Sequence, residues 1–563
     1  MIRLTTPYST GETPHCYYPR EQMKRDSFIC LNGYWSLSVG KNGDVDYIGE
    51  VLVPFPPESE ASGIERITVK GETLIYQRVF EISPHGRTLI HFGAVDCLCE
   101  VFINSKPAGE HSGGYLPFTL DITGLVCEGE NTITVTVNDP LSHDYGWGKQ
   151  KHKRGGMWYT PISGIWQTVW IESVPEKYIE SIRLTTPDLS SVKIETVGGD
   201  EKKTLIFEGK EYPYEGNSFI LTVDSPRLWS PQDPFLYGFE LVCGEDRISS
   251  YFALRTVTIN ERDGVSYICL NGKPYFFHGL LDQGYYSDGI YTPGNEKGFI
   301  DDILRMKELG FNMLRKHIKI EPDIFYYYCD KYGMIVFQDM VNNGGYNFIL
   351  DTALPTVGIR HFLSRPSSKK RQRIFMKESV ATVKHLYNHP SVVYYTIFNE
   401  GWGQHKATKV YRKLKECDPS RIWDTASGWF KDCESDVQSE HIYFRAVDIK
   451  PQKGRPMVLS EFGGYSCKLT EHSYNHEKTY GYKTCADRRE FTSDLEELYI
   501  NEIVPMIGRG LCAAVLTQVS DVEDETNGLV TYDRQVIKPD GEVMRSVADK
   551  IFRAFDEQCG IDK

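Results

Sequence analysis

Two glutamates stand at the ends of strongly apolar segments. The segment "YYTIFNE" ends at Glu400, and "MVLSE" ends at Glu461. A single glutamate at a strand end is more often part of a structural ion pair. Two of them at one cleft could break a glycosidic bond, because one can protonate the leaving oxygen while the other attacks the anomeric carbon or orients water. Glu400 and Glu461 are therefore our candidate catalytic residues.

The segments that carry these glutamates alternate with helical patterns. Apolar runs such as "MIVFQDM" and "VVYYTIFNE" are separated by segments with apolar i, i+3, i+4 spacing, such as "EKGFIDDILRMKELG". This alternation predicts a parallel (β/α)8 TIM barrel over residues 261–563. Active groups of such barrels sit at the C-terminal ends of the strands, which is where both glutamates fall.

Short strands with few helical periods fill the chain before the barrel. Residues 1–175 contain alternating segments such as "LNGYWSLS" and "NTITVTVND", which predict a β-sandwich of jelly-roll type. Residues 176–260 contain a second set, including "YGFELVC", whose length suits an immunoglobulin-like β-sandwich. No Cys-Trp-Cys signature is present there, so this prediction rests on length and pattern. The protein is predicted to be multidomain, with both sandwiches N-terminal to the barrel.

Composition narrows the range of partners. The net charge of −14 argues against nucleic acid, because phosphate binding needs a basic surface. No apolar run approaches the roughly 18 residues of a membrane span, and the first 20 residues lack a signal-peptide core. We therefore expect a cytoplasmic protein with no membrane partner, whose 14 cysteines are reduced thiols. Aromatic residues make up 13% of the chain, which suits stacking on sugars.

Motifs along nearly the whole chain resemble one enzyme family. They are "LNGYWSLS", "GMWYTPISGIWQTVW", "WSPQDPFLYGFEL", "GFNMLRKHI", "YTIFNEGWG" and "VLSEFGG". In this order they resemble glycoside hydrolase family 2, the group of β-galactosidases, β-glucuronidases and β-mannosidases. The resemblance implies that Glu400 is the general acid/base, that Glu461 is the nucleophile, and that Asn399 binds the sugar 2-hydroxyl. It also implies retention of configuration through a covalent glycosyl-enzyme, with the carboxyl groups about 5–5.5 Å apart.

The resemblance also implies roles for other residues at the barrel rim. Arg315 would keep Glu461 ionised, and Tyr443 would hydrogen-bond to it. Thr517 and Gln518 replace a tryptophan platform, so Trp402, Trp429 and Tyr285 are expected to supply the stacking surface. For each rim candidate the alternative is a packing or supporting role. The further candidates for substrate binding are His317, Asp282, Gln283, Asp339, His441, Gln518 and Asp521.

The segment 521–525 holds four carboxylates, which could indicate a metal site. We instead expect a solvated loop with one or two carboxylates aimed at sugar hydroxyls. Gly156 precedes Met157-Trp158, where β-galactosidases of this family have an acidic residue, and the retaining reaction needs no metal. We expect no metal and no other cofactor.

The sequence indicates the type of reaction more clearly than the sugar on which the enzyme acts. β-Glucuronidases of this family read the uronate with an Asn-x-Lys, whereas this chain has Asn527-Gly528-Leu529 and a lysine only later, at Lys538. We therefore expect a β-galactosidase acting on an oligosaccharide or glycoside. The segment 341–371, with Tyr346, Phe348 and Phe362, is expected to shape the aglycone side.

Three alternatives stay open. The scaffold could serve a β-uronidase or a transglycosylase with the same two carboxylates, or a carbohydrate-binding protein without catalysis. Homo-oligomerisation is also left open, because nothing in the sequence decides it.

Overall fold

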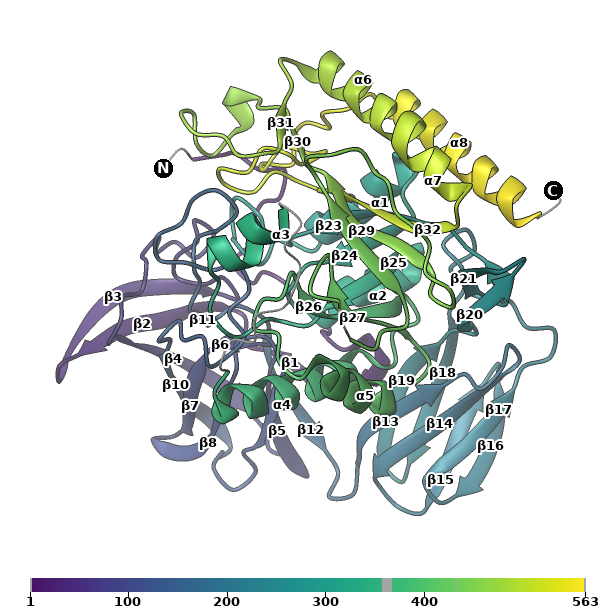
Figure 1. Ribbon diagram of the computed structural model, residues 1–563. Helices are drawn as coiled ribbons and strands as arrows, with labels where there is room; N and C mark the ends of the chain where they lie inside the picture. Colours follow the sequence, from purple (N-terminus) through teal and green to yellow (C-terminus); the bar gives the residue numbers. More distant parts are fainter. Residues whose placement is uncertain (1–2, 357–366, 432, 561–563) are drawn as a thin grey trace.

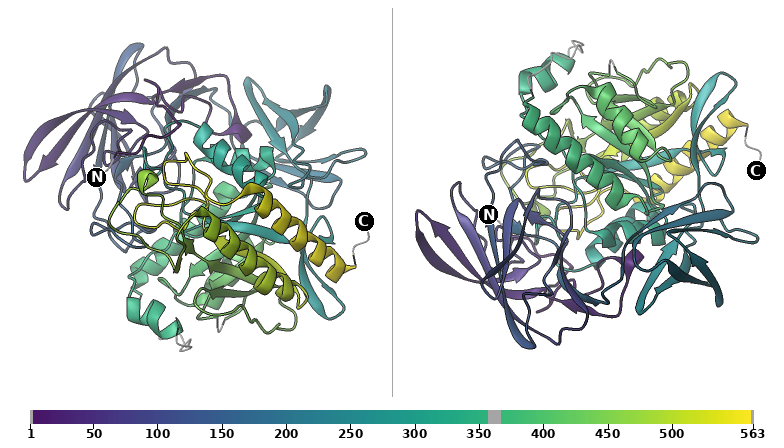
Figure 2. Two further views of the ribbon diagram at one scale, coloured as in Figure 1. Left: turned by 90° about the horizontal axis from the view of Figure 1, so that it is seen from above. Right: turned by 90° about the horizontal axis from the view of Figure 1, so that it is seen from below.

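The computed structural model describes residues 3–356, 367–431 and 433–560, so Phe362 lies outside the described residues. Two β-sandwiches lie on one side of a barrel that is built from the C-terminal half of the chain (Figure 1). Figure 2 shows from two further directions that the three parts pack against one another. The multidomain architecture predicted from the sequence is confirmed, while the limits 1–175, 176–260 and 261–563 stay a prediction.

The first sandwich has a six-stranded and a four-stranded antiparallel sheet. In sheet order, the six strands are β3 (Asp44–Val53), β2 (Gly33–Lys41), β4 (Thr73–Ile82), β10 (Gly129–Asn138), β7 (Leu98–Ile103) and β8 (Lys106–Ser112), and the four are β1 (Phe28–Cys30), β12 (Val169–Val174), β5 (Arg87–Phe92) and β9 (Phe118–Asp121). A two-stranded piece joins β6 (Val95–Asp96) to β11 (Gly164–Ile165). Alternation explains the core: Ile133, Val135 and Val137 of β10 are buried, and the residues between them are half-buried.

The second sandwich packs a three-stranded sheet on a four-stranded one, as expected for an immunoglobulin-like domain. In sheet order, the strands are β13 (Ile179–Thr185), β14 (Ser191–Gly198) and β17 (Ser218–Thr222), then β16 (Lys210–Glu215), β15 (Lys202–Phe207), β18 (Tyr237–Cys243) and β19 (Asp246–Phe252). Its core is a separate cluster of apolar residues that includes Leu205, Leu241 and Ile248.

The barrel contains eight parallel strands. In chain order they are β23 (Phe277–Asp282), β24 (Met313–Lys316), β25 (Ile335–Asp339), β26 (Val392–Asn399), β27 (Ile422–Ser427), β28 (Gln438–Ile442), β29 (Met457–Gly463) and β32 (Leu511–Thr517). Strands β27 and β28 contact each other without a hydrogen-bonded ladder, so the barrel is nearly closed. The small sheet of β20 (Val257–Arg262), β21 (Val265–Leu270) and β22 (Lys273–Pro274) contributes to the same apolar cluster as the barrel interior.

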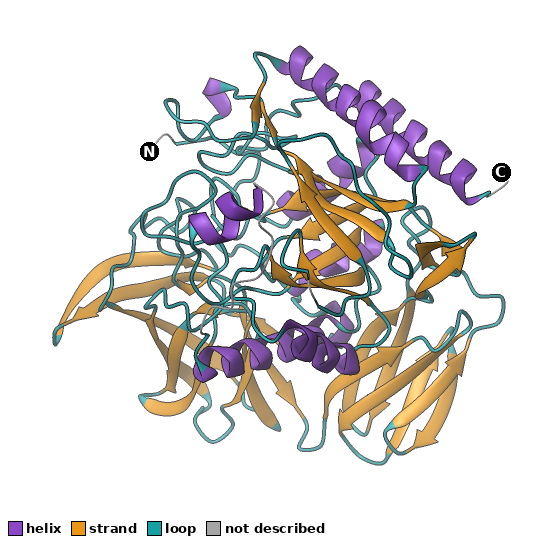
Figure 3. Cartoon of the chain, in the orientation of Figure 1, coloured by secondary structure: helices purple, strands orange, loops and turns teal. Residues whose placement is uncertain are grey.

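Helices cover the barrel unevenly (Figure 3). They are α1 (Lys297–Glu308), α2 (Asp323–Tyr332), α3 (Leu354–Thr356), α4 (Lys369–Leu386), α5 (Ala407–Cys417), α6 (Arg488–Leu498), α7 (Val504–Ile507) and α8 (Gly541–Cys559). The described residues between β27 and β28, and those between β28 and β29, form no helix. These two connections lack an apolar 3.6 period; the first contains Gly428 and the second contains Pro451 and Gly454, which explains why they fold as loops. None of the described helices is long and apolar enough to span a bilayer.

A buried arginine joins the two sandwiches. Arg25 donates to both carboxylate oxygens of Asp246 at 2.8 and 3.0 Å and to Glu172 at 3.1 Å. It also donates to the Ile179 carbonyl at 2.7 Å. Glu172 belongs to β12 of the first sandwich, whereas Asp246 and Ile179 belong to β19 and β13 of the second. The junction between the sandwiches is therefore a network of charge-assisted hydrogen bonds.

Replacing this arginine should destabilise the protein. Arg25→Met leaves two carboxylates at the junction without their shared cation, and we expect a loss of about 3–5 kcal/mol in the free energy of unfolding. The denaturant midpoint followed by fluorescence measures it. Arg87→Met is the matched control, because Arg87 and Asp121 pair on the surface, where such pairs contribute less than about 1 kcal/mol. Equal effects of the two substitutions would contradict the assignment.

Candidate active site

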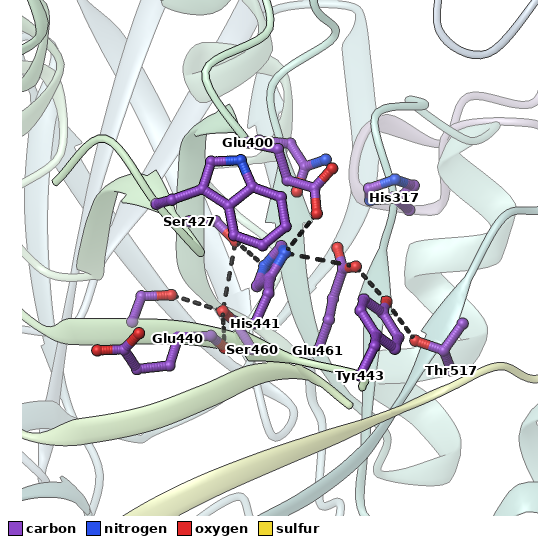
Figure 4. A network of polar contacts seen from close by, with 12 residues as sticks. His317, Glu400, Ser427, Glu440, His441, Tyr443, Ser460, Glu461 and Thr517 are labelled. Carbon is purple, nitrogen blue, oxygen red and sulfur yellow. Dashed lines mark hydrogen bonds and ion pairs between the residues drawn. The ribbon is translucent and has the colours of Figure 1, made fainter. Parts of the chain in front are cut away.

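The two candidate glutamates meet at the C-terminal rim of the barrel (Figure 4). Glu400 follows β26, and Glu461 lies near the end of β29. One carboxylate oxygen of each and a ring nitrogen of His441 all lie within 4.8 Å of one another. Both glutamates are buried, with 8% and 5% of their surface exposed. Two distant segments of the sequence thus place two carboxylates in one small volume.

Local irregularities of the backbone aim these side chains. The register of β29 shifts against both of its neighbours at Ser460 and Glu461, as a β-bulge does. Glu400 has a φ of 49°, a left-handed conformation that is rare for a glutamate. Its amide donates to the Ser427 carbonyl at 3.1 Å, which holds this turn. Strained backbone of this kind is concentrated at functional sites.

Arg315 organises the floor of the site from β24. Its guanidinium donates two hydrogen bonds of 3.0 Å to Asp339 and one of 3.0 Å to Glu461 Oε1. A further bond of 3.0 Å reaches Asn399 Oδ1. On the other side of Glu461, the Tyr443 hydroxyl donates to Oε2 at 2.5 Å and lies 3.0 Å from Thr517 Oγ1. Both oxygens of Glu461 are therefore held by donors.

Glu400 has a different environment. Burial raises the pKa of its carboxyl group above the ordinary 4.5, and the negative charge of Glu461 raises it further. His441 opposes this shift, because its Nδ1 atom contacts Glu400 Oε1 at 2.9 Å. The other ring nitrogen of His441 lies 2.6 Å from the Ser427 hydroxyl. Burial lowers the pKa of His441, so a neutral ring that donates from Nδ1 and accepts at Nε2 satisfies both contacts.

His317 and Asp339 complete this cluster. His317 Nδ1 lies 2.9 Å from Asp339 Oδ2. Burial lowers the pKa of His317 to about 4, so the ring is neutral at pH 7. The structure thus brings together the predicted residues Arg315, His317, Asp339 and Asn399 with His441, Tyr443 and the two glutamates.

Two of the predicted residues, Asp282 and Asp521, form ion pairs with lysines. Asp282 accepts a 2.6 Å bond from Lys316, whose ammonium lies over the Phe325 ring of α2, on the outer side of the barrel. Asp521 accepts a 2.7 Å bond from Lys538. Both carboxylates are engaged in buried ion pairs, and their roles in substrate binding stay predictions.

Among the described residues, the two predicted glutamines, Gln518 and Gln283, are likewise not hydrogen-bonded to the two glutamates. Gln518 donates to the Asn527 side chain at 2.8 Å, while its own oxygen is buried without a partner. Gln283 is buried beside Asp282, and its amide nitrogen has no partner. Within the described part of the chain, neither amide hydrogen-bonds to the cluster around the two glutamates.

The acidic segment 521–525 is not a solvated loop, contrary to expectation. All four carboxylates are buried. Glu523 accepts from the Thr160 amide at 2.8 Å, Glu525 from the Tyr159 hydroxyl, and Asp524 from Asn475 at 2.8 Å. The loop is buried because it docks onto the jelly-roll domain, a contact that the sequence does not reveal.

A cavity of about 790 Å³ opens beside Glu400. The barrel contributes Trp429, His441 and Tyr443, and the jelly roll contributes Lys151 and Trp158. The sequence did not indicate that Lys151, Trp158, Tyr480 and Tyr482 line this cavity. The motif "GMWYTP", residues 156–161, was a signal for Trp158 alone, and only the docking of the jelly roll places Trp158 and Lys151 at the barrel mouth.

The predicted aromatic residues separate into two groups. Trp429 lines the cavity, while Trp402 is buried behind it against Trp158, with 5.4 Å between ring centres. Tyr285 packs against Tyr159 and Tyr291 and is not part of the cavity lining, so its stacking role stays a prediction.

Among the described residues, two groups are spaced so that they could hold a metal ion: Glu400 with His441 and Glu461, and Asp96 with Cys97 and Asp139. In the first group, His441 Nδ1 lies 2.9 Å from Glu400 Oε1 and 3.5 Å from Glu461 Oε2.

Family models match three successive parts of the chain. The sugar binding domain model of glycosyl hydrolases family 2 matches residues 51–175, and the TIM barrel domain model matches residues 262–465. A third glycosyl hydrolases family 2 model matches residues 178–255. The chain belongs to glycoside hydrolase family 2. The resemblance drawn from the sequence motifs is confirmed.

Relatives in family 2 have different activities. A β-galactosidase of Leuconostoc mesenteroides is 26% identical over 437 residues, and a β-glucuronidase of Chlorocebus aethiops is 27% identical over 385. These matches cover 71% and 60% of this chain, but only 40% and 56% of the relatives. A β-D-glucuronidase structure from Dictyoglomus thermophilum superposes with a TM-score of 0.74 at 19% identity, covering 95% of this chain and 98% of that one. A β-galacturonidase from Eisenbergiella tayi gives a TM-score of 0.70 at 19% identity, covering 94% and 98%.

The protonation of Glu400 can be tested directly. Its carboxyl group should titrate above pH 4.5, because burial and the charge of Glu461 both oppose ionisation. Infrared difference spectra between wild type and Glu400→Gln, recorded against pH, isolate its carbonyl band. In His441→Phe the midpoint should move to higher pH, since a contact that favours the ionised form is removed. A midpoint at or below 4.5, or a downward shift in the histidine variant, would refute this account of the site.

Proposed function

We propose that the protein is a retaining exo-β-glycosidase that works by double displacement through a covalent glycosyl-enzyme on Glu461. The observation that carries this proposal is the approach of the Glu400 and Glu461 carboxylates to within 4.8 Å. Retaining enzymes have carboxyl groups about 5–5.5 Å apart, whereas inverting enzymes need about 6.5–9.5 Å to admit a water molecule. The short separation supports attack by the carboxylate itself.

In the first step, a Glu461 oxygen forms a bond to the anomeric carbon while the bond to the leaving oxygen breaks. Glu400 gives its proton to that oxygen, and the alcohol departs. In the second step, Glu400, now ionised, takes a proton from water, whose oxygen attacks the anomeric carbon. The ester bond breaks and Glu461 is released as a carboxylate.

The electrostatics of the pair suit these two roles. Before the reaction, the charge of Glu461 raises the pKa of Glu400, which favours the protonated acid. Formation of the ester removes that charge, so the pKa of Glu400 falls and the same residue can act as a base. Arg315 and Tyr443 hold Glu461 in position from both sides, and Asn399 is placed by Arg315 for the sugar 2-hydroxyl.

Glu461→Gly should abolish hydrolysis of an aryl β-glycoside, because no carboxylate remains to form the ester. Added azide should restore turnover and give an α-glycosyl azide, since the anion fits the space left by the carboxylate. Chromatography and NMR of the product measure the outcome. The control is Glu440→Gly, which removes a buried glutamate of β28 that pairs with Lys431 and keeps the catalytic pair. Wild-type rates in Glu461→Gly would remove Glu461 as nucleophile.

For the sugar, we propose a β-galactoside first, because the Asn-x-Lys of the glucuronidases is absent. Lys538 cannot replace that lysine, since it is fully buried and its ammonium is bonded to Asp521.

A β-uronide is the second candidate, and the position of Lys149 favours it. This lysine is 7% exposed, and its ammonium lies 5.7 Å from the Tyr159 ring centre. Its charge adds to the effect of burial in lowering the pKa of His317, and it opposes the burial that raises the pKa of Glu400. No described carboxylate lies at salt-bridge distance from Lys149.

A panel of nitrophenyl glycosides that vary only in the sugar separates these candidates. Galactoside turnover that survives Lys149→Gln would support the first. Uronide turnover that falls by about 100-fold in Lys149→Gln would support the second, because a buried carboxylate would lose its cation. Transfer to added sugar in place of hydrolysis would indicate a transglycosylase. Tight sugar binding without turnover across the panel would indicate a binding protein and contradict the proposed enzyme.

A further inference from the structure

The cavity beside Glu400 lies on the side of the leaving group. Glu400 and His441 line it, whereas Glu461, Arg315 and Asn399 do not. In the reaction proposed above, Glu400 protonates the leaving oxygen, so the group attached to that oxygen must lie on the Glu400 side. The cavity of about 790 Å³ is therefore where the aglycone is held, and this inference rests on the proposed function. Its size falls within the roughly 300–1,000 Å³ of sites that take drug-sized ligands.

The lining of this cavity is predominantly aromatic. It includes Trp158, Tyr346, Phe348, Trp429, Phe444 and Tyr482. The described lining residues contain no Asp, Asn, Gln, Ser or Thr. Besides Glu400 and His441, the described lining offers polar partners at Lys151, Arg445 and the tyrosine hydroxyls, and the rest of it is ring face, aliphatic side chain or glycine. Hydroxyls of a second sugar that faced this apolar part would lose water without gaining a partner. The lining thus favours a flat apolar leaving group over a saccharide.

Two sets of rings from different domains form the lining. On the barrel side, Tyr482 stacks on Tyr443 with ring centres 4.0 Å apart, and the edge of Phe444 meets Tyr482 at 5.0 Å. On the jelly-roll side, Trp158 meets Tyr346 at 4.9 Å. Lys151 places its ammonium 3.6 Å from the centre of the Trp158 ring, which holds this indole in place. Rings fixed in this way present flat apolar surface to an occupant.

Large apolar side chains also remain exposed at the cavity. Phe348 is 64% exposed and Phe444 is 65% exposed, although both line it. They come from segments on different sides of the barrel mouth, after β25 and after β28. Both rings extend the aromatic lining of the cavity toward solvent, and exposed apolar surface at a pocket is a feature of ligand-binding grooves. An apolar occupant would cover these two rings.

We propose that this cavity is an aglycone subsite for a flat, largely apolar group. The substrates are then β-glycosides of aromatic or polycyclic alcohols, and oligosaccharides are poor substrates. Phe348, Phe444 and Tyr482 determine this specificity, while Trp158 and Lys151 contribute to it from the jelly roll.

Binding of 2-naphthol, measured by equilibrium dialysis, tests the subsite without any assumption about the sugar. Wild type should bind it, and Phe444→Ala and Phe348→Ala should each weaken binding by up to about tenfold, because apolar contact area is lost. Tyr34→Ala is the matched control, since Tyr34 is 54% exposed on β2, outside the cavity lining, and its removal should change nothing. Equal affinity in wild type and both phenylalanine variants, or no binding to wild type, would overturn the proposal.

A second measurement compares leaving groups by affinity, so that differences in their chemical reactivity do not matter. Inhibition constants of three sulfur-linked glycosides are determined for the sugar that the nitrophenyl panel selects. The naphthyl compound should bind about tenfold more tightly than the methyl compound, and the disaccharide no more tightly than the methyl compound. A disaccharide that binds as tightly as the naphthyl compound would refute the subsite and leave the two-carboxylate mechanism standing. Full activity of Glu461→Gly would instead refute the mechanism, whatever the naphthol result.

Discussion

The site depends on one buried cation, the guanidinium of Arg315. It is 1% exposed, and removing a partner from such a charge costs several kcal/mol. Its donors reach Asp339, Asn399, Glu461 and the Ser460 carbonyl, which belong to β25, β26 and β29. Together with its own strand β24, it therefore fixes the relative positions of four strands at the rim. The nucleophile candidate and the residue before the acid candidate are held by the same side chain.

The two glutamates differ because their surroundings differ. Glu461 accepts hydrogen bonds from a guanidinium and a phenol, whereas Glu400 contacts a neutral histidine in a buried environment. Burial and the neighbouring negative charge raise the pKa of Glu400. The division of roles in the proposed mechanism thus follows from hydrogen-bond donors and burial, since the residue type is the same at both positions. It also makes the protonation of one glutamate depend on the charge of the other.

The jelly roll is part of the active-site region and does more than cover the barrel. Glu523 and Glu525, in the loop after β32, accept hydrogen bonds from Thr160 and Tyr159. These contacts anchor the segment that carries Trp158 at the barrel mouth. The cavity therefore exists only when the two domains are docked. In the proposed function, the barrel supplies the chemistry and the boundary between the domains selects the leaving group.

The sequence by itself determined the multidomain architecture and the family, and it singled out the two glutamates as catalytic candidates. Strand alternation, βα periodicity and strand-end motifs are local signals, so they can be recognised without knowing which distant residues are in contact.

The sequence could not decide which polar residues face the site. Asp282 and Asp521 are paired with Lys316 and Lys538, and these pairings depend on contacts across the fold. The bulge at Ser460 and Glu461 breaks the alternation of β29, so side-chain direction there cannot be counted along the strand. The cavity lining likewise required tertiary structure, because docking alone brings Lys151 and Trp158 beside Glu400.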